Sequence, residues 1–424
     1  MGLDQREKLM LYKEIVEKIS VGVEKKLKQK EYLKEGLFEV VDQGQSLVGG
    51  FSNDSSLVVK CDLPVIVFGD HTKCVKFIDF PFVAGADGVK VLRAKECADA
   101  KFLYYYTLLL TKKMIDKGYA RHYQFLEKME VNIPSFDEQK RIVNKIEELF
   151  SELDSAVETL KKTKEQLAVY RQSVLECAFE GKYTIDWRKL NKYSVSEFKK
   201  ELYKKRCDVG NTSEYQFMEE ISLPSIPKGW DWVFVGDIVT SPEYGTSKKS
   251  LKNGKVPVLR MGNMKNGSID WDDLVYSNDE EDNKKYRLHD QDVLFNRTNS
   301  PEHVGKTSIF KGEQEAIFAG YIIRINQLPE INAQYLTYYM NSHTAKKYSN
   351  KVKTDGVNQS NINGKKLLSY PFPLCTRGEQ DKIVDEIEIR LSKCDSIEKT
   401  VNDALIQANA MRQSILKKAF EGSL

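Results

Sequence analysis

The sequence predicts an α+β protein in which two mixed α/β globular regions are separated by two long helices packed as an antiparallel coiled coil, with a pseudo-twofold internal repeat. Three observations lead to this prediction. A long segment occurs twice, both copies have the apolar spacing of a supercoiled helix, and each follows a stretch rich in short strand-like runs. With 424 residues the chain has room for two or more domains of about 100–200 residues.

The repeated segment covers residues 138–181 and again 379–422, an offset of 241 with no gap. Nineteen of the 44 aligned positions are identical, and both copies end in "RQS" followed by "AFEG". Apolar residues recur at alternating spacings of four and three, which keeps them on one stripe of a supercoiled helix. Gly181 and Gly422 stand where such helices would end.

The sequence therefore predicts long spacer helices over 137–181 and 378–424, each a rod of roughly 60 Å. The residues predicted to pack between them are Ile142, Ile146, Leu149, Leu153, Leu160, Leu167, Ile383, Ile387, Ile397, Val401, Met411 and Ile415. A single amphipathic helix of this length cannot bury its stripe, so we expect the two copies to pair antiparallel within the chain. The alternative is two parallel zippers that each recruit another subunit.

The predicted globular regions are residues 1–136 and 222–377, with a polar, helix-prone connector over 182–221. Both contain runs rich in Val, Ile and Phe that are interrupted by Gly, Asn, Asp and Pro, which is typical of short strands. The phrases "FLYYYTLL" (102–109) and "YLTYYMNS" (335–342) suggest that the two regions are distant copies. Their tyrosines are expected to pack a helix against a sheet rather than to stack on bases.

Composition is that of an ordinary globular protein, with a net charge of only +3. Basic residues are concentrated in two places. Residues 344–377 hold seven Lys or Arg against one acid, and a second cluster, "KKSLKNGK", lies earlier in the chain at 248–255. Seven scattered cysteines without a C-x-x-C pair, and a start without signal-peptide layout, predict a cytoplasmic protein with reduced thiols. No apolar run approaches the ~20 residues that span a bilayer.

The sequence offers no convincing catalytic or metal site. It has no G-x-G-x-x-G after a strand, no H-E-x-x-H and no G-x-S-x-G, and its five histidines lack metal-ligand spacing. Gly305-Lys306-Thr307 resembles the end of a phosphate-binding loop, but Ser300 and Pro301 stand where that loop needs its first glycine and a free N–H. We expect neither catalysis nor a cofactor in this chain.

Two unlike globular regions held by a rod suit a long target with a regular backbone, such as duplex DNA. Base edges are recognised by Arg, Lys, Asn, Gln, Ser and Thr, and the loops of both regions are rich in these residues. Ordinary turn chemistry is the alternative explanation for each of them. The candidate DNA-binding residues are Gln43, Gln45, His71, Thr72, Lys73, Arg121, Arg260, Asn263, Asn296, Arg297, Thr298, Asn299, Lys306, Lys351, Lys353, Asn358, Gln359, Asn361 and Lys365.

Over essentially its whole length the chain resembles the specificity (S) subunit of Type I restriction–modification systems. The phrases that resemble the family, in order, are "FGDHTKCVKFIDFPFVAGADGVKVL", "EQKRIV", "AFEGKYTIDWRK", "LPSIPKGWDWVFVGDI", "VLFNRTN…VGKTSIF", "NQSNINGKKLLSYPFPL" and "LKKAFEG". Their order, together with the repeated helices, makes the resemblance specific. The first globular region departs from the pattern because it has no counterpart of "GWDW" (229–232).

The resemblance implies that residues 1–136 and 222–377 are target-recognition domains, each reading one half of a bipartite DNA site. It implies that the spacer helices bind methyltransferase (M) subunits, usually two, which use S-adenosylmethionine to methylate adenine. Restriction (R) subunits would add ATP- and Mg-dependent cleavage. Two identical M subunits would require the same helical surface twice, which explains the repeat.

Two alternatives remain at this point. One is a stand-alone nucleic-acid-binding regulator with a coiled-coil spacer, and the other is an adaptor whose globular regions bind proteins. A fused restriction–methylation enzyme is disfavoured because the chain lacks a methyltransferase domain.

Overall fold

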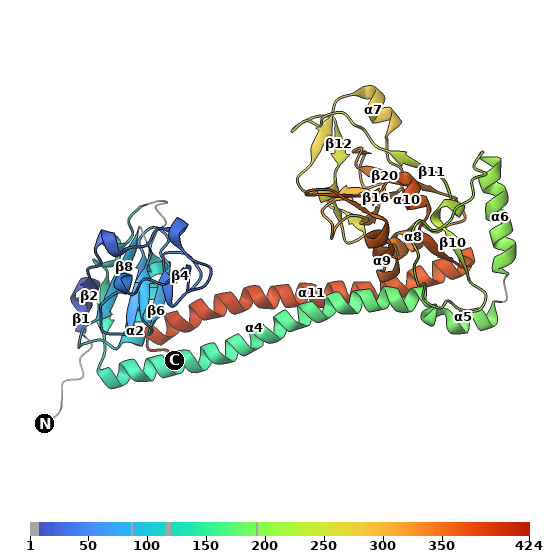
Figure 1. The fold of residues 1–424 in the computed structure, drawn as a ribbon. Coiled ribbons are helices and arrows are strands. Elements are labelled where there is room, and N and C mark those ends of the chain that lie inside the picture. The colour runs from blue at the N-terminus through green and yellow to red at the C-terminus, as the bar shows by residue number, and fades with distance from the viewer. Residues whose placement is uncertain (1–7, 86–87, 116–119, 192–193) are drawn as a thin grey trace. The chain divides into compact units, whose positions relative to one another are not determined.

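The computed structural model describes residues 8–85, 88–115, 120–191 and 194–424, and the chain divides into two compact units. The first comprises residues 1–162 and 401–424, and the second residues 163–400. Helices α4 (Phe136–Phe179) and α11 (Arg377–Phe420), each of 44 residues, contribute to both units (Figure 1).

The globular part of the first unit contains three small sheets. Strands β1 (Lys8–Leu11) and β9 (Glu130–Ile133) pair antiparallel. A four-stranded antiparallel sheet has the order β2 (Val16–Ile19), β8 (Val89–Ala94), β5 (Val65–Gly69) and β6 (Val75–Ile78). A three-stranded sheet has the order β4 (Gly50–Ser52), β3 (Phe38–Val41) and β7 (Phe82–Ala84), with β3 and β7 parallel.

The helices of this part are α1 (Tyr12–Ile15), α2 (Ala100–Lys113) and α3 (Tyr123–Leu126), with short 3-10 turns η1 (Val23–Lys25), η2 (Gln29–Glu31) and η3 (Ser55–Leu57). The apolar face of α2 joins a core that includes Phe68 and Leu92 of the four-stranded sheet. That core also contains Ile142 and Ile146 of α4 and Leu416 of α11. The long helices are therefore part of the hydrophobic core of the first unit.

The second unit has a larger set of sheets. The main antiparallel sheet has the order β11 (Val239–Tyr244), β20 (Ile322–Gln327), β16 (Val293–Asn296) and β18 (Thr307–Ile309). A three-stranded sheet has the order β15 (Val275–Ser277), β12 (Val256–Leu259) and β19 (Ile317–Phe318). Smaller pairings join β10 (Asp231–Phe234) to β23 (Pro371–Leu374), β13 (Met264–Lys265) to β14 (Ser268–Ile269), and β22 (Ser360–Asn361) to both β17 (Thr298–Asn299) and β21 (Thr354–Asp355).

The helices of the second unit both precede and follow its strands. They are α5 (Ile185–Leu190), α6 (Val195–Asp208), α7 (Glu280–Lys285), α8 (Ala333–Met340), α9 (His343–Val352) and α10 (Gly364–Leu368), with 3-10 turns η4 (Lys182–Thr184), η5 (Val235–Asp237) and η6 (Met261–Asn263). The predicted connector contains α5 and α6. Helix α6 packs on the unit through buried Leu202 and through Arg206, whose guanidinium meets the Asp237 carboxylate at 3.2 Å. The connector is thus part of the second unit's surface.

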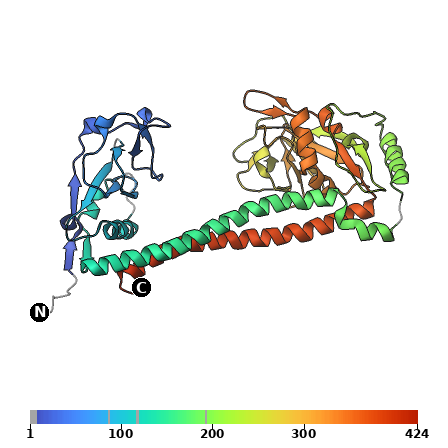
Figure 2. The ribbon, with the colours of Figure 1, turned by 60° about the horizontal axis from the view of Figure 1, so that its bottom comes forward.

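Within each unit the two long helices run antiparallel (Figures 1 and 2). In the first unit, Arg412 of α11 forms an ion pair with Asp154 of α4. In the second, Arg171 of α4 pairs with Asp395 of α11 at 2.7 Å. These pairs occupy matched positions of the repeat, because an offset of 241 carries Arg171 to Arg412 and Asp154 to Asp395. The structure thus favours the intramolecular antiparallel pair over two zippers.

The last aromatic residue of each long helix packs on a helix of one of the globular parts. Phe420 of α11 stacks on Tyr106 of α2, with ring centroids 4.5 Å apart, and meets Phe102 edge-on. Phe179 of α4 meets Tyr335 and Tyr339 of α8 edge-on, each at 5.2 Å. Gly181 and Gly422 follow with φ near +67° and +69°, which glycine adopts readily. The predicted helix ends are therefore confirmed. The tyrosines of α2 and α8 also pack on strands, as expected: Tyr104 contacts Phe77 of β6, and Tyr335 and Tyr339 contact Phe372 of β23.

The predicted apolar stripe of α11 is wrong at two positions. Ile397 and Met411 are 46% and 56% exposed. Along this stretch Ile387, Cys394, Val401 and Ala408 are buried, so one residue in seven faces the partner helix instead of two. A straight helix drifts relative to a 3.5-residue repeat, and a lone pair of helices covers only a narrow stripe of each, so the second position turns to solvent. Near the end of α11 the buried residues are Leu416 and Ala419, while Ile415 is half-buried.

Candidate nucleic-acid interface

In the second unit, the small sheet β17–β22–β21 brings together loops that are far apart in the sequence. Thr298 pairs with Asn361, and Asn361 in turn pairs with Thr354 across the same sheet. Five of the predicted residues lie on these strands or in the turn that joins β21 to β22: Thr298, Asn299, Asn358, Gln359 and Asn361. The sheet therefore gathers donors and acceptors of the kinds that recognise base edges.

Arg297 lies at the edge of this sheet on an aromatic support. Its guanidinium stacks over the Tyr244 ring, 4.9 Å from the centroid, and its Nη2 donates to Asn361 Oδ1 at 3.4 Å. The Tyr244 hydroxyl accepts the Gly364 N–H at 2.8 Å, which ties the ring to α10. Asn361 Nδ2 donates to Thr298 Oγ1 at 2.7 Å. This network holds the arginine fork in a defined orientation, as bidentate recognition requires.

The β21–β22 turn projects from the sheet. Its backbone is closed by the Gly356 N–H, which donates to the Gln359 carbonyl at 2.7 Å. Asn358 and Gln359 are exposed, and the Val357 side chain between them and the strand is fully exposed. An apolar side chain at such a tip is suited to contact a thymine methyl group.

Lysines surround the sheet. Lys365 is exposed, and Lys366 Nζ donates to Thr354 Oγ1 at 2.6 Å. Lys353 Nζ lies 3.6 Å from the Asp355 carboxylate, and Lys351 Nζ donates to the Glu220 carbonyl. Lysines at the edge of a base-reading surface can meet phosphates, which position a protein on DNA without specifying sequence.

Three predicted residues are buried or already bonded within the protein, which keeps them from bases in this conformation. Asn296 is fully buried at the end of β16. Asn263 is also buried: its amide donates to the carbonyls of Asp270 and Asp272 and organises that loop. Arg260 is held by the Asp273 carboxylate at 3.0 Å. Here the ordinary role of Asn in turns, which is to bond the nearby backbone, outweighs base recognition.

In the first unit, a loop after β3 packs against the β5–β6 turn. Gln43 accepts the His71 N–H through Oε1 at 3.3 Å, and its carbonyl accepts the Thr72 hydroxyl at 2.7 Å. A Cβ on Gly69 would come within 2.8 Å of the Gln43 Cβ, so only glycine permits this approach. Gln43 therefore mainly fixes the shape of the turn.

The other residues predicted in the first region lie around the same turn. Lys73 stands in the turn with a positive φ of 58°, and Gln45 is exposed in the neighbouring loop. Arg121 directly precedes His122 and Tyr123, whose N–H groups donate to the carbonyl and carboxylate of Asp70, both at 2.8 Å. The fold thus gathers the predicted residues of the first region onto one surface.

Sequence reasoning missed Tyr244, which supports Arg297, and the glutamines that join the long helices to the globular parts. Gln139 of α4 accepts the Asp99 N–H at 2.7 Å, and Gln380 of α11 accepts the Asn332 N–H at 2.9 Å. Asp99 and Asn332 are the N-caps of α2 and α8. The "EQ" pair at the start of each repeat was a visible signal, whereas nothing in the sequence marks Tyr244.

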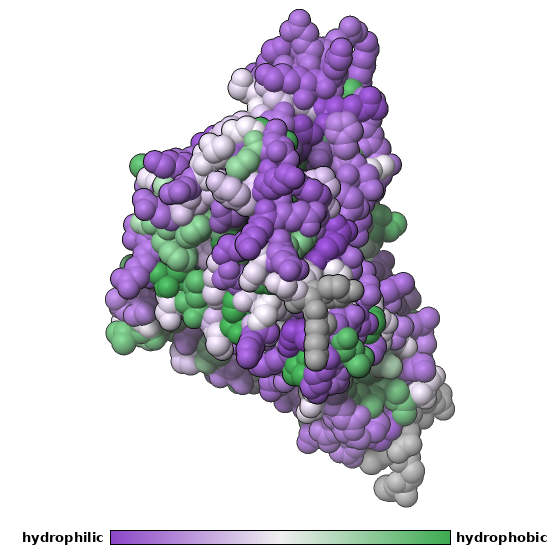
Figure 3. All heavy atoms as spheres, turned by 90° about the vertical axis from the view of Figure 1, so that its right-hand side faces the viewer, coloured by the Kyte–Doolittle hydropathy of each residue, from purple (hydrophilic) through white to green (hydrophobic). Residues whose placement is uncertain are grey.

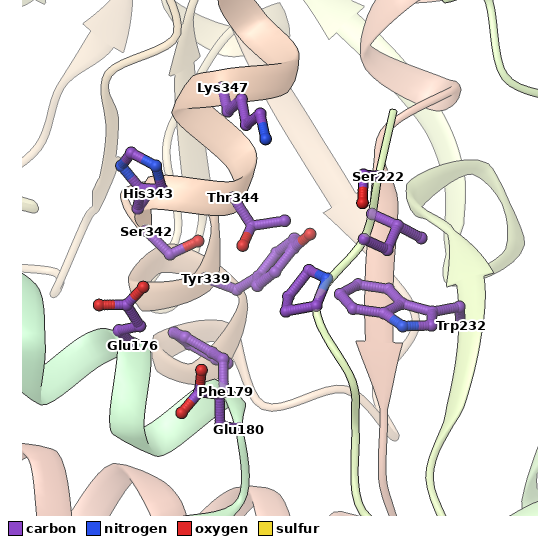
Figure 4. Close-up of a pocket in the computed structure, with 12 residues that line it drawn as sticks. Glu176, Phe179, Glu180, Ser222, Trp232, Tyr339, Ser342, His343, Thr344 and Lys347 are labelled. Carbon is purple, nitrogen blue, oxygen red and sulfur yellow. The ribbon is translucent and has the colours of Figure 1, made fainter. Parts of the chain in front are cut away.

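A cavity of about 210 Å³ lies where α4 ends against α8 and α9 (Figure 4). The Tyr339 ring lies centrally between Trp232 and Thr344, and its hydroxyl has no hydrogen-bond partner among the described residues. The matched Tyr106 hydroxyl of the first unit accepts the Asn132 N–H at 3.0 Å. Burial raises the pKa of Tyr339, so the phenol stays neutral. The cavity is lined by none of the predicted base-reading residues.

The face shown in Figure 3 is mostly hydrophilic with scattered apolar patches. Among the described residues, no helix is long and apolar enough to cross a membrane. The same part of the chain holds no group of three or more His, Cys, Asp or Glu side chains that could bind a metal ion.

Comparison with known protein families identifies the class. The family described as Type I restriction modification DNA specificity domain matches the chain twice, over residues 12–168 and 227–407. The chain therefore belongs to this family of Type I restriction–modification specificity proteins.

Among curated relatives, the Type I restriction enzyme EcoKI specificity subunit of Escherichia coli K12 is 30% identical over 300 residues, covering 69% of this chain and 57% of that protein. The StySPI specificity subunit of Salmonella potsdam is 28% identical with the same coverage. The EcoR124I/EcoR124II specificity subunit of Escherichia coli is 22% identical over 91% of this chain and 86% of that protein. The chain thus spans just over half of the first two relatives.

Solved structures show the same fold. A chain from a structure of the type I R-M system aligns over 100% of both chains with a TM-score of 0.67 at 16% identity. The HsdS subunit from Thermoanaerobacter tengcongensis aligns over 100% of this chain and 99% of that chain, with a TM-score of 0.52 at 16% identity. The α+β fold with its long helices is therefore shared with these proteins.

Proposed function

We propose that this chain is the sequence-specific DNA-recognition subunit of a Type I restriction–modification complex. Each globular region, 1–136 and 222–377, reads one half of a bipartite DNA site. The observation that supports this most is the β17–β22–β21 sheet, where Arg297 stacked on Tyr244 is joined by the exposed Asn358 and Gln359. Such an array can recognise bases, and it lies within reach of several lysines.

The spacer helices, in this proposal, dock two methyltransferase subunits. Tyr170 and Met411 occupy matched positions of the repeat and are 49% and 56% exposed. Exposed apolar side chains at equivalent places on both copies would offer two identical subunits the same anchor.

Catalysis belongs to the partners in this proposal. The methyltransferase subunits would bind S-adenosylmethionine, and restriction subunits would use ATP and Mg. The present chain contributes recognition and spacing, and we place the complex in the cytoplasm.

The decisive experiment is co-expression with a methyltransferase subunit from the same genome, followed by sequencing of methylated adenines in the host. A gapped two-part motif that disappears when this chain is removed supports the proposal. A monomeric protein with no methylation favours a stand-alone regulator. If the chain shows no salt-dependent binding to duplex DNA, a protein-binding adaptor is favoured.

A further inference from the structure

A groove separate from the β17–β22–β21 sheet lies in the second unit, where the long helices meet the globular part. It encloses about 530 Å³ and is lined by α4, α8, α9, α11, the β13–β14 hairpin and the loop that precedes β18. Arg171, Lys265, Lys306 and Lys346 all contribute to its walls. Four basic side chains therefore line the groove.

Two of these cations are already neutralised. Arg171 pairs with Asp395 at 2.7 Å and with Glu398 at 2.9 Å, and Lys265 pairs with Asp270. Lys306 and Lys346, by contrast, have no acid within ion-pair distance among the described residues. Glu302 also lines the groove, but bonds from its own backbone N–H and from Ser300 are what mainly lower its pKa.

The two unneutralised lysines affect each other. Desolvation by the groove, and then the positive charge of Lys306, lower the pKa of Lys346. Two like charges held close together are unfavourable, and an anion between them would remove the repulsion. The Lys346 side chain stays open to solvent, so an anion can reach it.

Lys306 belongs to the "VGKTS" phrase that resembles part of a phosphate-binding loop. The Thr307 N–H donates to Asn341 Oδ1 at 3.3 Å, so this backbone donor is occupied and no phosphate cradle forms. Lys306 can therefore act only as a single flexible cation, which suits one phosphate oxygen rather than a nucleotide triphosphate.

We propose that this groove binds a backbone phosphodiester of the target DNA, held between Lys306 and Lys346. The inference rests on the proposed function and adds a second, sequence-independent contact to it. The contact would lie beside α4, so that it would fix the second region's register on the duplex while the β17–β22–β21 sheet reads bases.

The test measures the salt dependence of binding to a duplex of random sequence, using the full chain in complex with its methyltransferase subunits. Replacing both lysines, Lys306→Gln and Lys346→Gln, removes the contact to one phosphate and should therefore lower the slope of log affinity against log salt by about one. Lys347→Gln is the matched control, because Lys347 neighbours Lys346 on α9 but lines the cavity of Figure 4. It should leave the slope within experimental error.

The charge-conserving pair Lys306→Arg and Lys346→Arg should retain the wild-type slope, which excludes a folding defect as the cause. An unchanged slope in the glutamine variant would overturn the inference while leaving the proposed function intact. Failure of the wild-type complex to bind DNA at all would overturn the proposed function itself. Inorganic phosphate that stabilises the wild type but not the glutamine variant, without any change in DNA slope, would identify a free-anion site and also overturn the inference.

Discussion

At the residue scale, the candidate interface depends on how individual side chains are supported. In the proposed function, Arg297 suits recognition because Tyr244 and Asn361 limit its rotamers, so that less entropy would be lost on contact with a base. Gln43 shows the opposite case: it has the right chemistry for a base but is bonded to the β5–β6 turn. A polar side chain can therefore be available for a DNA contact or be occupied in a loop, depending on its neighbours.

Arg297→Ala should weaken recognition of one half-site by about 1–3 kcal/mol and relax its sequence requirement. The other half-site should keep its specificity, because it is read by the other globular region. Methylation sequencing of the host checks both outcomes. Arg287→Ala is the control, since Arg287 lies in the same unit and its side chain forms an exposed ion pair with Glu315 at 3.7 Å. Equal loss at both half-sites would contradict two independent readers.

At the scale of elements, each long helix is attached to a globular helix by the same two devices. Gln139 and Gln380 accept the N–H groups of Asp99 and Asn332, the N-caps of α2 and α8, while Phe420 and Phe179 pack on those same helices. Phe420 contacts residues 102 and 106, and Phe179 contacts 335 and 339, which are matched positions of the two aromatic phrases. The start of one long helix and the end of the other thus meet at each globular helix, which explains why both ends of the repeat are preserved.

Gln380→Leu should destabilise the second unit by about 1–3 kcal/mol, because the buried amide also donates to the Cys375 carbonyl at 2.9 Å and both backbone groups would lose their partner. Denaturant unfolding of the full chain measures the loss. Gln407→Leu, on an exposed face of the same helix, should change stability by less than about 0.5 kcal/mol. Equal effects of the two changes would contradict the stabilising role of the Gln380 hydrogen bonds.

Tyr170 and Met411 are the proposed docking residues for the methyltransferase subunits. Tyr170→Ala or Met411→Ala should each remove one methyltransferase subunit from the complex and leave the fold intact, since both side chains are exposed. Light scattering of the purified complex gives the stoichiometry, and thermal unfolding of the chain alone controls for stability. Retention of both subunits by the double variant would show that docking occurs elsewhere.

At the scale of the whole molecule, the chain consists of two units, and each unit includes a part of both long helices. Ile146 and Ile387 are matched in the repeat, and both are fully buried, the first in unit one and the second in unit two. Each unit therefore depends on residues from distant parts of the sequence, and neither long helix can be removed without opening a core.

Ile387→Asp should strongly destabilise the chain, by about 3 kcal/mol or more, because it buries a carboxylate in the core. Ile389→Asp, two residues away and 49% exposed, should have little effect on unfolding. Urea unfolding followed by circular dichroism distinguishes the two. A matching change at Ile146 should affect the first unit in the same way, and similar stability of all three variants would contradict the packing.

The sequence by itself determined the repeat, the length and ends of the long helices and the α+β class, because apolar spacing, absence of Pro and Gly, and terminal glycines are local signals. It also selected loop residues of which many gather on two surfaces. Only the tertiary structure decided which of them are exposed: Asn263 and Asn296 are buried, and Ile397 and Met411 face outward. Burial and partner choice depend on which segments meet in the folded chain, from the nearby Asp270 loop that holds Asn263 to the pairing of the long helices, and a linear pattern does not contain those contacts.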